Sequence, residues 1–440
     1  MKKAALHNLG CKVNAYETEA MQQMLEEKGY EIVPFSEKAD VYVINTCSVT
    51  NVADKKSRQM IHRARRQNPN GIVVAAGCYV QTKKEQVLAD CDIDILLGNN
   101  KKHDLIYLLE EFEKQRGEKK AEIMDIGGPT QYEPLSIRRG QEHTRAFLKV
   151  QDGCNQFCSY CIIPYARGRI RSRGMEDVLK EARRLAANGH KELVLTGIHL
   201  SSYGVDTGTD LFHLIRAVHE VEGIRRIRLG SLEPKIVTRA FAQKLSAMPK
   251  VCPHFHLSLQ SGCDTVLKRM NRKYTAGEYR ESCEYLREFF AHPAITTDVI
   301  VGFPGETEEE FKTTRNFLRE IGFFEVHVFP YSKRQGTKAA EMQGQIPEEV
   351  KTARSKILLE DKKGLGENFA SWYQGRSVEV LLEEETLLEG KRCYMGHTPE
   401  YVKAICFGGE NLQNKMVKGY VKGQLCGHIL VTIHGLEGRS

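Results

Sequence analysis

The fold of this chain is decided by residues 146–161, which read AFLKVQDGCNQFCSYC. The first half predicts a buried β-strand, because apolar side chains recur over a run of strand length. Cys154, Cys158 and Cys161 follow that strand directly, on a loop at its carboxyl end. In barrels of alternating strands and helices, active sites assemble at this end. The stretch therefore predicts a catalytic cysteine loop at the mouth of an α/β barrel.

The spacing of these three cysteines indicates an iron–sulfur cluster. Three thiolates within eight residues can hold three irons of a [4Fe–4S] cubane and leave the fourth iron open. An open iron can bind S-adenosylmethionine and pass it an electron, which yields a 5′-deoxyadenosyl radical. A zinc site would need a fourth ligand, which no second Cys-x-x-Cys pair in the sequence supplies, and a redox Cys-x-x-Cys would leave Cys154 without a role. We expect Cys154, Cys158 and Cys161 to be the catalytic cluster ligands.

The central part of the chain, residues 144–374, repeats this pattern of strand and helix. Six such units predict an open, partial (β/α)6 barrel, and a flat doubly wound sheet is the alternative. The strands are expected at 146–151, 193–196, 226–230, 254–259, 295–301 and 326–329.

The flanking parts predict two smaller domains, which makes the whole an α/β multidomain protein. Residues 1–115 indicate a doubly wound α/β domain, with strands at 4–9, 41–46, 72–76 and 93–97 and helices at 17–28, 55–67 and 84–89. A polar linker with a short strand near 123–126 is expected at 116–143. Residues 375–440 indicate a small all-β barrel, with strands at 377–384, 401–407, 416–425 and 429–434.

The composition excludes several classes of protein. The chain has 440 residues, too many for one ordinary core. No apolar run approaches the length of a membrane span and the N-terminus lacks a signal-peptide core, so we expect a cytoplasmic protein with no membrane partner. An odd count of 13 cysteines argues against a disulfide framework. Seven of them show no partner spacing and are expected to be ordinary core or surface thiols: Cys91, Cys252, Cys263, Cys283, Cys393, Cys406 and Cys426.

Three further cysteines occupy equivalent positions in the N-terminal domain. Cys11, Cys47 and Cys78 each lie just past a predicted strand of the N-terminal domain, and Gly10 and Gly77 allow close approach of the backbone. The loops after parallel strands converge on one edge of an open sheet, where ligands usually bind. The residues alone leave two interpretations open, a second cluster with a free iron or three separate buried thiols.

Together these motifs resemble the radical methylthiotransferase family. The resemblance covers essentially the whole chain and rests on LGCKVN at 9–14, NTCSVT at 45–50, AGC at 76–78 and the cysteine loop at 154–161. It implies an N-terminal domain with an auxiliary [4Fe–4S] cluster, a radical SAM barrel with the catalytic cluster, and a terminal TRAM barrel. It further implies that Cys11, Cys47 and Cys78 are the auxiliary ligands and that C–H is replaced by C–SCH₃.

Two stretches, GCKVN at 10–14 and YCIIPYARGR at 160–169 followed by RSR at 171–173, resemble the MtaB branch of the family. That branch converts N6-threonylcarbamoyladenosine at position 37 of tRNA to its 2-methylthio derivative. The resemblance implies two S-adenosylmethionine molecules per turnover, one to methylate a sulfur on the auxiliary cluster and one to form the radical. The alternatives are isopentenyladenosine in tRNA or a ribosomal-protein aspartate. At 331–338 the family's prolines are replaced by Lys and Gln, which predicts a looser, more basic loop.

Residues at the strand ends and in the cysteine loop are candidates for contact with S-adenosylmethionine. Glu233 could take ribose hydroxyls or the ammonium group, and Gly197 permits close approach. Ser231 could instead be a helix N-cap, and Phe157 could belong to the core. The full set is Phe157, Tyr160, Thr196, Gly197, Ser231, Glu233, Gln260 and Asp298.

Arginines alternate just beyond the cysteine loop, and with a net charge of +7 they suit a phosphate backbone. We expect Arg167, Arg169, Arg171 and Arg173 to contact the anticodon stem-loop of tRNA. A further basic group contains Lys268, Arg269, Arg272 and Lys273. The other implied partner is a reductant such as flavodoxin or ferredoxin.

Two rival functions come from outside this family. One is a non-catalytic RNA-binding protein with a structural metal, against which the spacing of Cys154, Cys158 and Cys161 argues. The other is a radical SAM enzyme whose N-terminal domain binds a cobalamin-like cofactor, against which the three cysteines at its strand ends argue.

Overall fold

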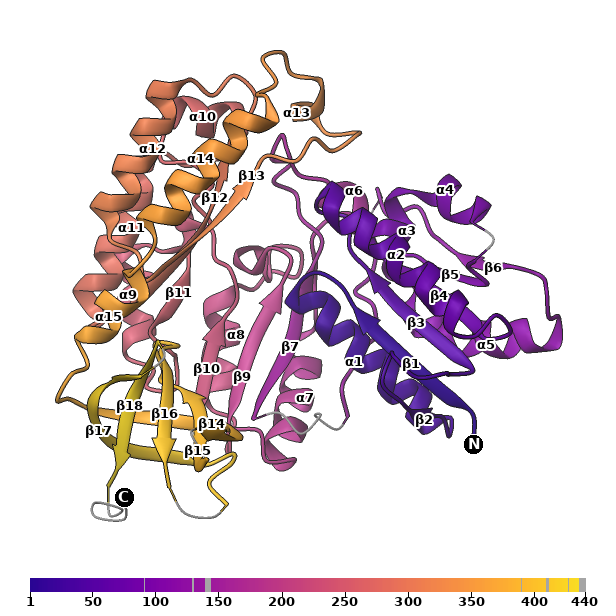
Figure 1. Cartoon of the computed structure of the whole chain (residues 1–440), viewed down its shortest axis with the longest axis horizontal. Coiled ribbons are helices and arrows are strands. Elements are labelled where there is room, and N and C mark those ends of the chain that lie inside the picture. The colour runs from indigo at the N-terminus through magenta and orange to yellow at the C-terminus, as the bar shows by residue number, and fades with distance from the viewer. Residues whose placement is uncertain are drawn as a thin grey trace.

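The computed structural model describes residues 1–90, 92–128, 130–138, 144–388, 390–408, 411–425 and 427–434. Two α/β units lie side by side, and a small β-barrel sits against one end of the larger unit (Figure 1). This arrangement confirms the predicted multidomain fold. Within the described residues, no helix is both long and apolar enough to cross a membrane.

The N-terminal unit is a parallel sheet in the order β2-β1-β3-β4-β5-β6. The order reverses between β1 and β3, as in doubly wound sheets. Its strands are β1 (Lys3–Asn8), β2 (Glu31–Ile32), β3 (Val41–Thr46), β4 (Ile72–Gly77), β5 (Ile95–Leu97) and β6 (Lys120–Glu122). Its helices are α1 (Lys12–Glu27), α2 (Asn51–Gln67), α3 (Cys78–Thr82), α4 (Lys84–Ala89), the 3-10 turn η1 (Lys102–Asp104) and α5 (Leu105–Lys114).

Most of the predicted N-terminal elements are confirmed, because buried parallel strands are apolar on both faces. Val43 packs on the side of α1 and α5, and Tyr42 packs on the side of α2. The short strand expected near 123–126 is wrong: the sixth strand is β6, just before that segment. Helix α5 was missed, although Leu105, Leu109 and Phe112 form its buried stripe.

The central unit is an open barrel of parallel strands that follow one another in sequence order. The strands β7, β9 and β10 form one sheet and β11, β12 and β13 another, and the parallel bridge between Leu232 and Leu257 connects the two. No reversal of order occurs, so the flat doubly wound alternative is wrong. The strands are β7 (Arg145–Asp152), β9 (Glu192–Gly197), β10 (Arg226–Leu229), β11 (His254–His256), β12 (Ala294–Val301) and β13 (Glu325–Pro330), with the short antiparallel β8 (Arg171–Ser172) at the edge.

Helices cover the outside of this barrel and bury the apolar side of each strand, while the alternate side chains face the lumen. The helices are α6 (Ile163–Arg167), α7 (Met175–Ala187), α8 (Leu211–His219), α9 (Arg239–Ser246), α10 (Asp264–Arg269), α11 (Ala276–Phe289), α12 (Glu308–Ile321), α13 (Lys338–Glu341), α14 (Glu348–Asp361) and α15 (Leu365–Ser371), with 3-10 turns η2 (Leu200–Ser202) and η3 (Pro234–Ile236).

The C-terminal unit is a closed barrel in the order β14-β15-β16-β18-β17. It docks on the amino ends of the central strands, where Arg226 donates to the carbonyl oxygen of His397 (2.9 Å) and Arg228 to that of Pro399 (2.8 Å). The cysteine loop lies at the opposite end of those strands. The strands of the small barrel are β14 (Ser377–Leu388), β15 (Lys391–His397), which the sequence analysis missed, β16 (Lys403–Phe407), β17 (Met416–Leu425) and β18 (His428–Ile433).

Helix α1 joins the two α/β units, because it belongs to both of their cores. Met21 and Leu25 pack in the N-terminal core, whereas Tyr16 and Ala20 pack with the strands and helices of the central barrel (Figure 1). The N-terminal unit therefore closes the open side of the central barrel.

The segments expected to be loose are packed in this structure. Leu135 and Ile137 of the predicted linker are buried in the barrel core, although residues 129 and 139–143 lie outside the described part. The loop at 331–338 is tied to the N-terminal unit, because Arg334 pairs with Asp54 (2.8 Å) and donates to the hydroxyl of Ser48 (2.8 Å). Two cysteines expected to be ordinary thiols, Cys91 and Cys426, also lie outside the described residues, and the other five of that set are buried: Cys252, Cys263, Cys283, Cys393 and Cys406.

Candidate iron–sulfur site

The cysteine loop is held to the barrel by its backbone rather than by packing of its thiols. The amide of Cys154 donates to the carbonyl of Gly168 (3.0 Å), and that of Cys161 donates to the carbonyl of Cys158 (2.9 Å). Asn271 reaches across from the end of α10 and donates to the carbonyl of Phe157 (2.9 Å). The loop is thus preorganised with its three sulfurs free of disulfides.

The thiols of this loop suit a positively charged cluster ion. Burial, together with the neighbouring thiols, raises the pKa of Cys154 to about 11 and that of Cys161 to about 12. Isolated thiolates are therefore unfavourable here, and iron would supply the missing positive charge. Arg272 already donates to the Cys158 sulfur (3.2 Å).

The second cysteine trio lies at the reversal point of the N-terminal sheet. Cys11 is the N-cap of α1, Cys47 follows β3, and Cys78 begins α3. Burial raises the pKa of Cys11, whereas Arg167 and the positive end of the α1 dipole favour its anionic form. Asn99 donates both to the Cys78 sulfur (3.4 Å) and to the carbonyl of Ala166 in α6 (2.7 Å), which ties this trio to the cysteine loop of the barrel.

Neither trio is compact enough for a single metal ion. Among the residues that the structure describes, two groups of ligating side chains bring their atoms within 4.8 Å of one another, and no cysteine belongs to either. A cubane spreads its thiolate ligands over a larger object than one ion does. Whether each trio holds a cluster stays a prediction.

Gly10 is required by the close approach of two loops in the second trio. A Cβ atom at Gly10, where φ is +101°, would lie 2.8 Å from the Cys47 sulfur. We expect Gly10→Ala to displace Cys47 and to lower the iron bound after anaerobic reconstitution by about half. The control is Gly29→Ala, which has a similar φ of +82° but open space around it, so both variants carry the same type of backbone strain of about 1–3 kcal/mol. Equal iron in both variants would contradict this role of Gly10.

A buried ionic cluster lies between the two trios. The carboxylate of Glu17 in α1 contacts Arg167 (2.8 Å), Lys149 (2.7 Å) and Lys102 (3.1 Å), and Asp152 contacts Lys149 (2.7 Å). All five side chains are at most 2% exposed. We name these five residues the ionic core. Three cations face two carboxylates, and the Nε atom of Arg167 has no hydrogen-bond partner among the described residues. This surplus of positive charge, next to Cys78, suits anionic sulfur ligands.

The predicted tRNA contact is wrong for three of the four arginines. Arg167 belongs to the ionic core, Arg171 is 2% exposed beside Asp152, and Arg173 pairs with Glu181 (2.7 Å). A phosphate cannot reach guanidinium groups that are enclosed between the two α/β units. Arg169 alone is exposed, and its guanidinium lies 4.7 Å from the centre of the Phe157 ring.

Most of the candidate cofactor residues lie at the carboxyl ends of the barrel strands, near the cysteine loop. Thr196 and Gly197 end β9, and a Cβ at Gly197 would meet the side chain of Gln151 at 2.8 Å. Ser231 is exposed just after β10, and Gln260 has a φ of +73° after β11. Their contact with S-adenosylmethionine stays a prediction.

Glu233 is the candidate cofactor residue whose carboxylate is held by two neighbouring side chains. Burial alone would raise its pKa, but hydrogen bonds and charges from His199 and Arg272 lower it, so the group is ionised. The carboxylate lies 3.1 Å from each of these two partners. Because Arg272 also contacts Cys158, it connects Glu233 to the cysteine loop. Sequence reasoning placed Arg272 in a basic surface group, but its side chain is only 6% exposed.

The aromatic residues of the cysteine loop pack on protein rings. Phe157 lies edge-on to Tyr165 with a centroid distance of 5.9 Å, and Tyr160 lies edge-on to Phe303 at 6.5 Å. Phe157 also has a positive φ of +49°. Both rings border the mouth, and packing against an adenine stays a prediction for each.

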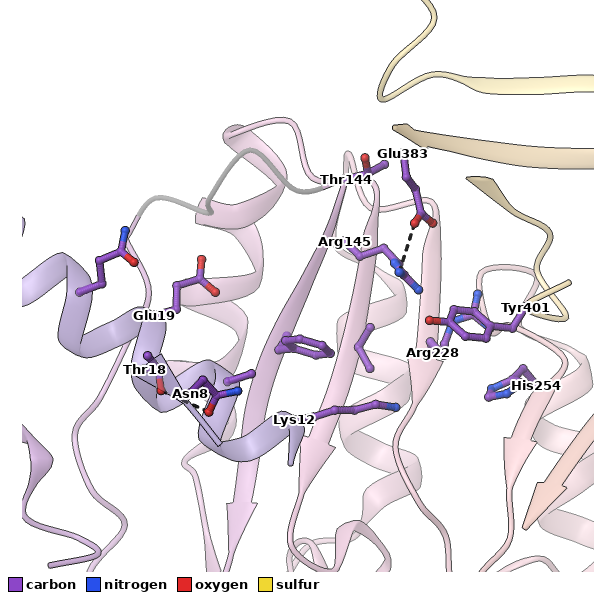
Figure 2. A pocket seen from close by; sticks show the side chains of 14 residues that line it. Asn8, Lys12, Thr18, Glu19, Thr144, Arg145, Arg228, His254, Glu383 and Tyr401 are labelled. Atoms are coloured by element: carbon purple, nitrogen blue, oxygen red, sulfur yellow. Dashed lines mark hydrogen bonds and ion pairs between the residues drawn. The ribbon is translucent and has the colours of Figure 1, made fainter. Parts of the chain in front are cut away.

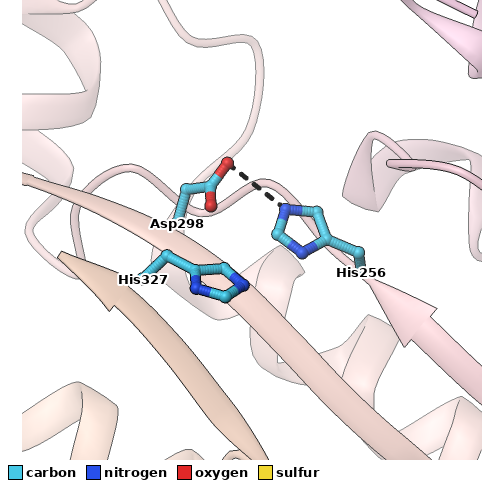
Figure 3. A group of neighbouring side chains, drawn as sticks. All are labelled: His256, Asp298 and His327. Carbon is cyan, nitrogen blue, oxygen red and sulfur yellow. Dashed lines mark ion pairs between the residues drawn. The ribbon is translucent and has the colours of Figure 1, made fainter. Parts of the chain in front are cut away.

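Asp298 lies beside His256 and His327, as Figure 3 shows. Its carboxylate is 3.3 Å from Nε2 of His256, and the ring of His327 stacks on that of His256. The ligand atoms of these three residues lie within 4.8 Å of one another. They form a polar wall that offers both donors and acceptors to a group inside the barrel.

A cavity of about 420 Å³ opens between α1, the lumen side of β7 and β10, and the C-terminal barrel (Figure 2). Its inner end is basic, since Lys12, Arg145 and Arg228 line it together with His254 and Tyr401. The cavity is of the size that small-molecule sites usually have.

Comparison with known proteins identifies two matching families. Residues 3–98 match "Uncharacterized protein family UPF0004", and residues 148–318 match the "Radical SAM superfamily". "Threonylcarbamoyladenosine tRNA methylthiotransferase MtaB" of Bacillus subtilis (strain 168) is 44% identical, over 95% of this chain and 93% of the relative. The same-named protein of Aquifex aeolicus (strain VF5) is 42% identical, over 88% of this chain and 94% of the relative. The chain belongs to the radical SAM methylthiotransferase family.

Other relatives of this methylthiotransferase carry a different substrate in their names. "tRNA-2-methylthio-N(6)-dimethylallyladenosine synthase" of Pelotomaculum thermopropionicum (strain DSM 13744 / JCM 10971 / SI) is 37% identical, over 98% of this chain and 97% of the relative. The family therefore includes enzymes that are named for differently substituted adenosines.

A solved structure resembles this methylthiotransferase in fold alone. The radical S-adenosylmethionine methyltransferase TsrM from Kitasatospora setae, solved with cobalamin and a [4Fe–4S] cluster, has a TM-score of 0.56 at 15% identity, over 75% of this chain and 72% of that chain.

Sequence reasoning missed several residues that shape the site of this methylthiotransferase. Glu17, Lys102 and Lys149 of the ionic core are far apart in the chain, and no local pattern marks them. Asn99 shows no signal either, because a single buried amide is common in loops. Lys12 could have been found, since it stands next to Cys11 in the LGCKVN motif.

Proposed function

We propose that this methylthiotransferase converts N6-threonylcarbamoyladenosine at position 37 of tRNA to its 2-methylthio derivative, with a catalytic and an auxiliary [4Fe–4S] cluster. The observation that carries the proposal is the placement of two cysteine trios on either side of α6. Asn99 joins Cys78 to Ala166 in that helix, and Arg167 joins it to the ionic core. Within the family, four relatives named for threonylcarbamoyladenosine are 35–44% identical to this chain.

When bound, the clusters and S-adenosylmethionine supply the radical and the methylated sulfur, at two S-adenosylmethionine molecules per turnover. The residues of the chain provide the positions. Cys154, Cys158 and Cys161 hold the catalytic cluster at the barrel mouth, and Cys11, Cys47 and Cys78 hold the auxiliary cluster on the sheet edge that faces it. A short-lived radical requires substrate and sulfur within contact distance, so the fixed docking of the two units is essential.

The chain's own side chains orient S-adenosylmethionine at the mouth. The ionised Glu233 is poised to accept hydrogen bonds from ribose hydroxyls or the ammonium group, and His199 and Arg272 hold it in place. The missing side chain of Gly197 makes room for that of Gln151 at the end of β9. A reductant such as flavodoxin or ferredoxin supplies the electron. Because the reductant and the tRNA substrate are expected in the cytoplasm, we expect the reaction to take place there.

The test is a reaction of the anaerobically reconstituted enzyme with anticodon stem-loops that carry threonylcarbamoyladenosine, dimethylallyladenosine or adenosine. We expect mass spectrometry to find SCH₃ in place of hydrogen on the first substrate. Equal amounts of 5′-deoxyadenosine and S-adenosylhomocysteine should accompany the product. Product from the dimethylallyl substrate alone would show that the second named substrate class is the correct one.

A further inference from the structure

The inner end of the lumen cavity contains a fixed basic frame. Arg228 is held by Glu192 through two contacts (2.7 and 3.1 Å), and Arg145 is held by Glu383 (3.1 Å). Both guanidinium groups lie over the ring of Tyr401, at 4.6 and 5.0 Å from its centre. These contacts keep the two arginines in place whether or not a ligand is bound.

Lys12 is the basic group that this frame leaves without a partner. It has no ion pair or hydrogen bond within the described part of the chain, yet its side chain extends from the start of α1 into the cavity towards Arg228 and His254 (Figure 2). Among the described residues, the cations Lys12, Arg145 and Arg228 share this end of the cavity with the carboxylates of Glu192 and Glu383, and the charge of Asp298 also acts on Lys12. Glu19 lines the cavity farther along α1.

His254 provides a second, independent sign of a ligand. Its side chain lines the cavity, it is only 8% exposed, and its Nδ1 atom has no hydrogen-bond partner among the described residues. Burial, together with the charges of Arg228 and Lys12, holds the pKa of His254 well below its usual range. The ring is therefore neutral and can offer one N–H to an acceptor.

The position of the cavity relates it to one edge of the substrate base. In adenine, C2 and the N6 substituent flank N1 on the same edge of the ring. A base whose C2 faces the cysteine loops at the barrel mouth therefore holds its N6 substituent close to those loops, and the chain of the threonylcarbamoyl group can extend from there past Lys12 into the lumen. Lys12 directly follows Cys11, so it stands at the boundary between the mouth and this cavity.

We propose that Lys12 and His254 bind the carboxylate of the N6-threonylcarbamoyl group and so determine which modified adenosine is accepted. This inference rests on the proposed function and extends it. The threonine part of the substituent carries a free carboxylate and a hydroxyl, whereas a dimethylallyl group carries neither. Lys12 supplies the opposite charge and His254 a hydrogen bond, within the frame made by Arg145 and Arg228. The wall of His256, Asp298 and His327 can receive the hydroxyl.

The experiment compares two anticodon stem-loops that differ only in the acid of the threonylcarbamoyl group, one with the carboxylate and one with its carboxamide. Binding is measured by fluorescence anisotropy and methylthiolation by mass spectrometry, both with the anaerobically reconstituted enzyme. We expect the wild type to prefer the acid by about ten- to one-hundredfold, since a hydrogen bond to a charged group has that effect. Lys12→Met should abolish this preference, so that the acid and the carboxamide are bound and methylthiolated about equally.

Two variants accompany this comparison. Lys28→Met removes the same charge at the other end of α1, where Lys28 pairs with Glu110 on the surface, and it should keep the preference of the wild type. His254→Phe removes the N–H but keeps the ring, and it should lower the preference in both readouts. Iron content and 5′-deoxyadenosine formation report whether the substitution of Lys12 disturbs Cys11. If Lys12→Met loses iron, the acid preference of His254→Phe decides whether this cavity binds the carboxylate.

The outcomes separate the two proposals. Methylthiolation of the threonylcarbamoyl substrate by the wild type, with an unchanged acid preference in Lys12→Met or in an iron-replete His254→Phe, would overturn the inference and leave the proposed function standing. A wild type that modifies only the dimethylallyl stem-loop would overturn both.

Discussion

The triple variant Cys154→Ala, Cys158→Ala and Cys161→Ala is expected to form no 5′-deoxyadenosine. These thiols are the only three on the loop at the barrel mouth, and S-adenosylmethionine can be cleaved only at an iron that the protein leaves open. After anaerobic reconstitution, iron and sulfide should fall to about half of the wild-type content, because the N-terminal trio still binds its cluster. The measurements are iron and sulfide analysis and liquid chromatography of the nucleoside products.

The matching triple variant Cys11→Ala, Cys47→Ala and Cys78→Ala should show the complementary result. It is expected to lose the other half of the iron and to form no methylthio product, yet to continue cleaving S-adenosylmethionine. Cys283→Ala is the control, because Cys283 lies in α11, belongs to neither trio and is fully buried in the barrel core. Full iron content in the N-terminal variant would refute an auxiliary cluster on these residues.

The substitution Glu17→Gln in the ionic core is expected to lower the free energy of unfolding by about 3–5 kcal/mol. Removing one carboxylate leaves Arg167, Lys149 and Lys102 buried with one remaining counter-ion, Asp152, and an unpaired buried charge has a cost of this size. Urea unfolding followed by circular dichroism measures the change. The control is Glu320→Gln, whose partner Arg280 is exposed, and it should leave the midpoint unchanged. Equal midpoints for the two variants would contradict the importance of the ionic core.

The same residue gives a direction for the pH dependence of stability. Burial would raise the pKa of Glu17, but Arg167, Lys102 and Lys149 hold it well below its usual range. A carboxyl group with a lowered pKa in the folded state stabilises the protein above its unfolded pKa of about 4.3, and this contribution is lost as pH falls below that value. Stability of the wild type should thus fall from pH 5 to about pH 3 more steeply than that of Glu17→Gln. If the free energy of unfolding fell equally steeply with decreasing pH in both proteins, Glu17 would not be ionised in the folded state.

The elements of the fold were largely predictable because they depend on local patterns. The apolar run before Cys154 and the alternation of strands with helices are visible in any short window, and the barrel and the doubly wound sheet follow from them. The short strand β2 and the helix α5 were missed because one is only two residues long and the other lies at a domain edge.

The partners of the buried charges could not be predicted, because they lie far apart in the chain. Arg167 and Arg173 belong to a run in which every second residue is an arginine, which is the pattern of a surface strand. Their carboxylate partners, Glu17 and Glu181, come from α1 and α7, and only the docking of the two units brings them together. Charge patterning along a sequence shows where cations are, but it does not show which of them are neutralised.

The double membership of α1 limits how this architecture can be rearranged. Tyr16 and Ala20 fill the barrel core while Met21 and Leu25 fill that of the N-terminal sheet, so neither unit presents a finished surface without the other. Expressed as separate fragments, each would expose an apolar stripe and an unmatched set of buried charges. Grafting the N-terminal unit onto a foreign barrel would succeed only if that barrel supplied a surface that fits this face of α1. The two units are therefore expected to be exchanged between proteins together and not as separate modules.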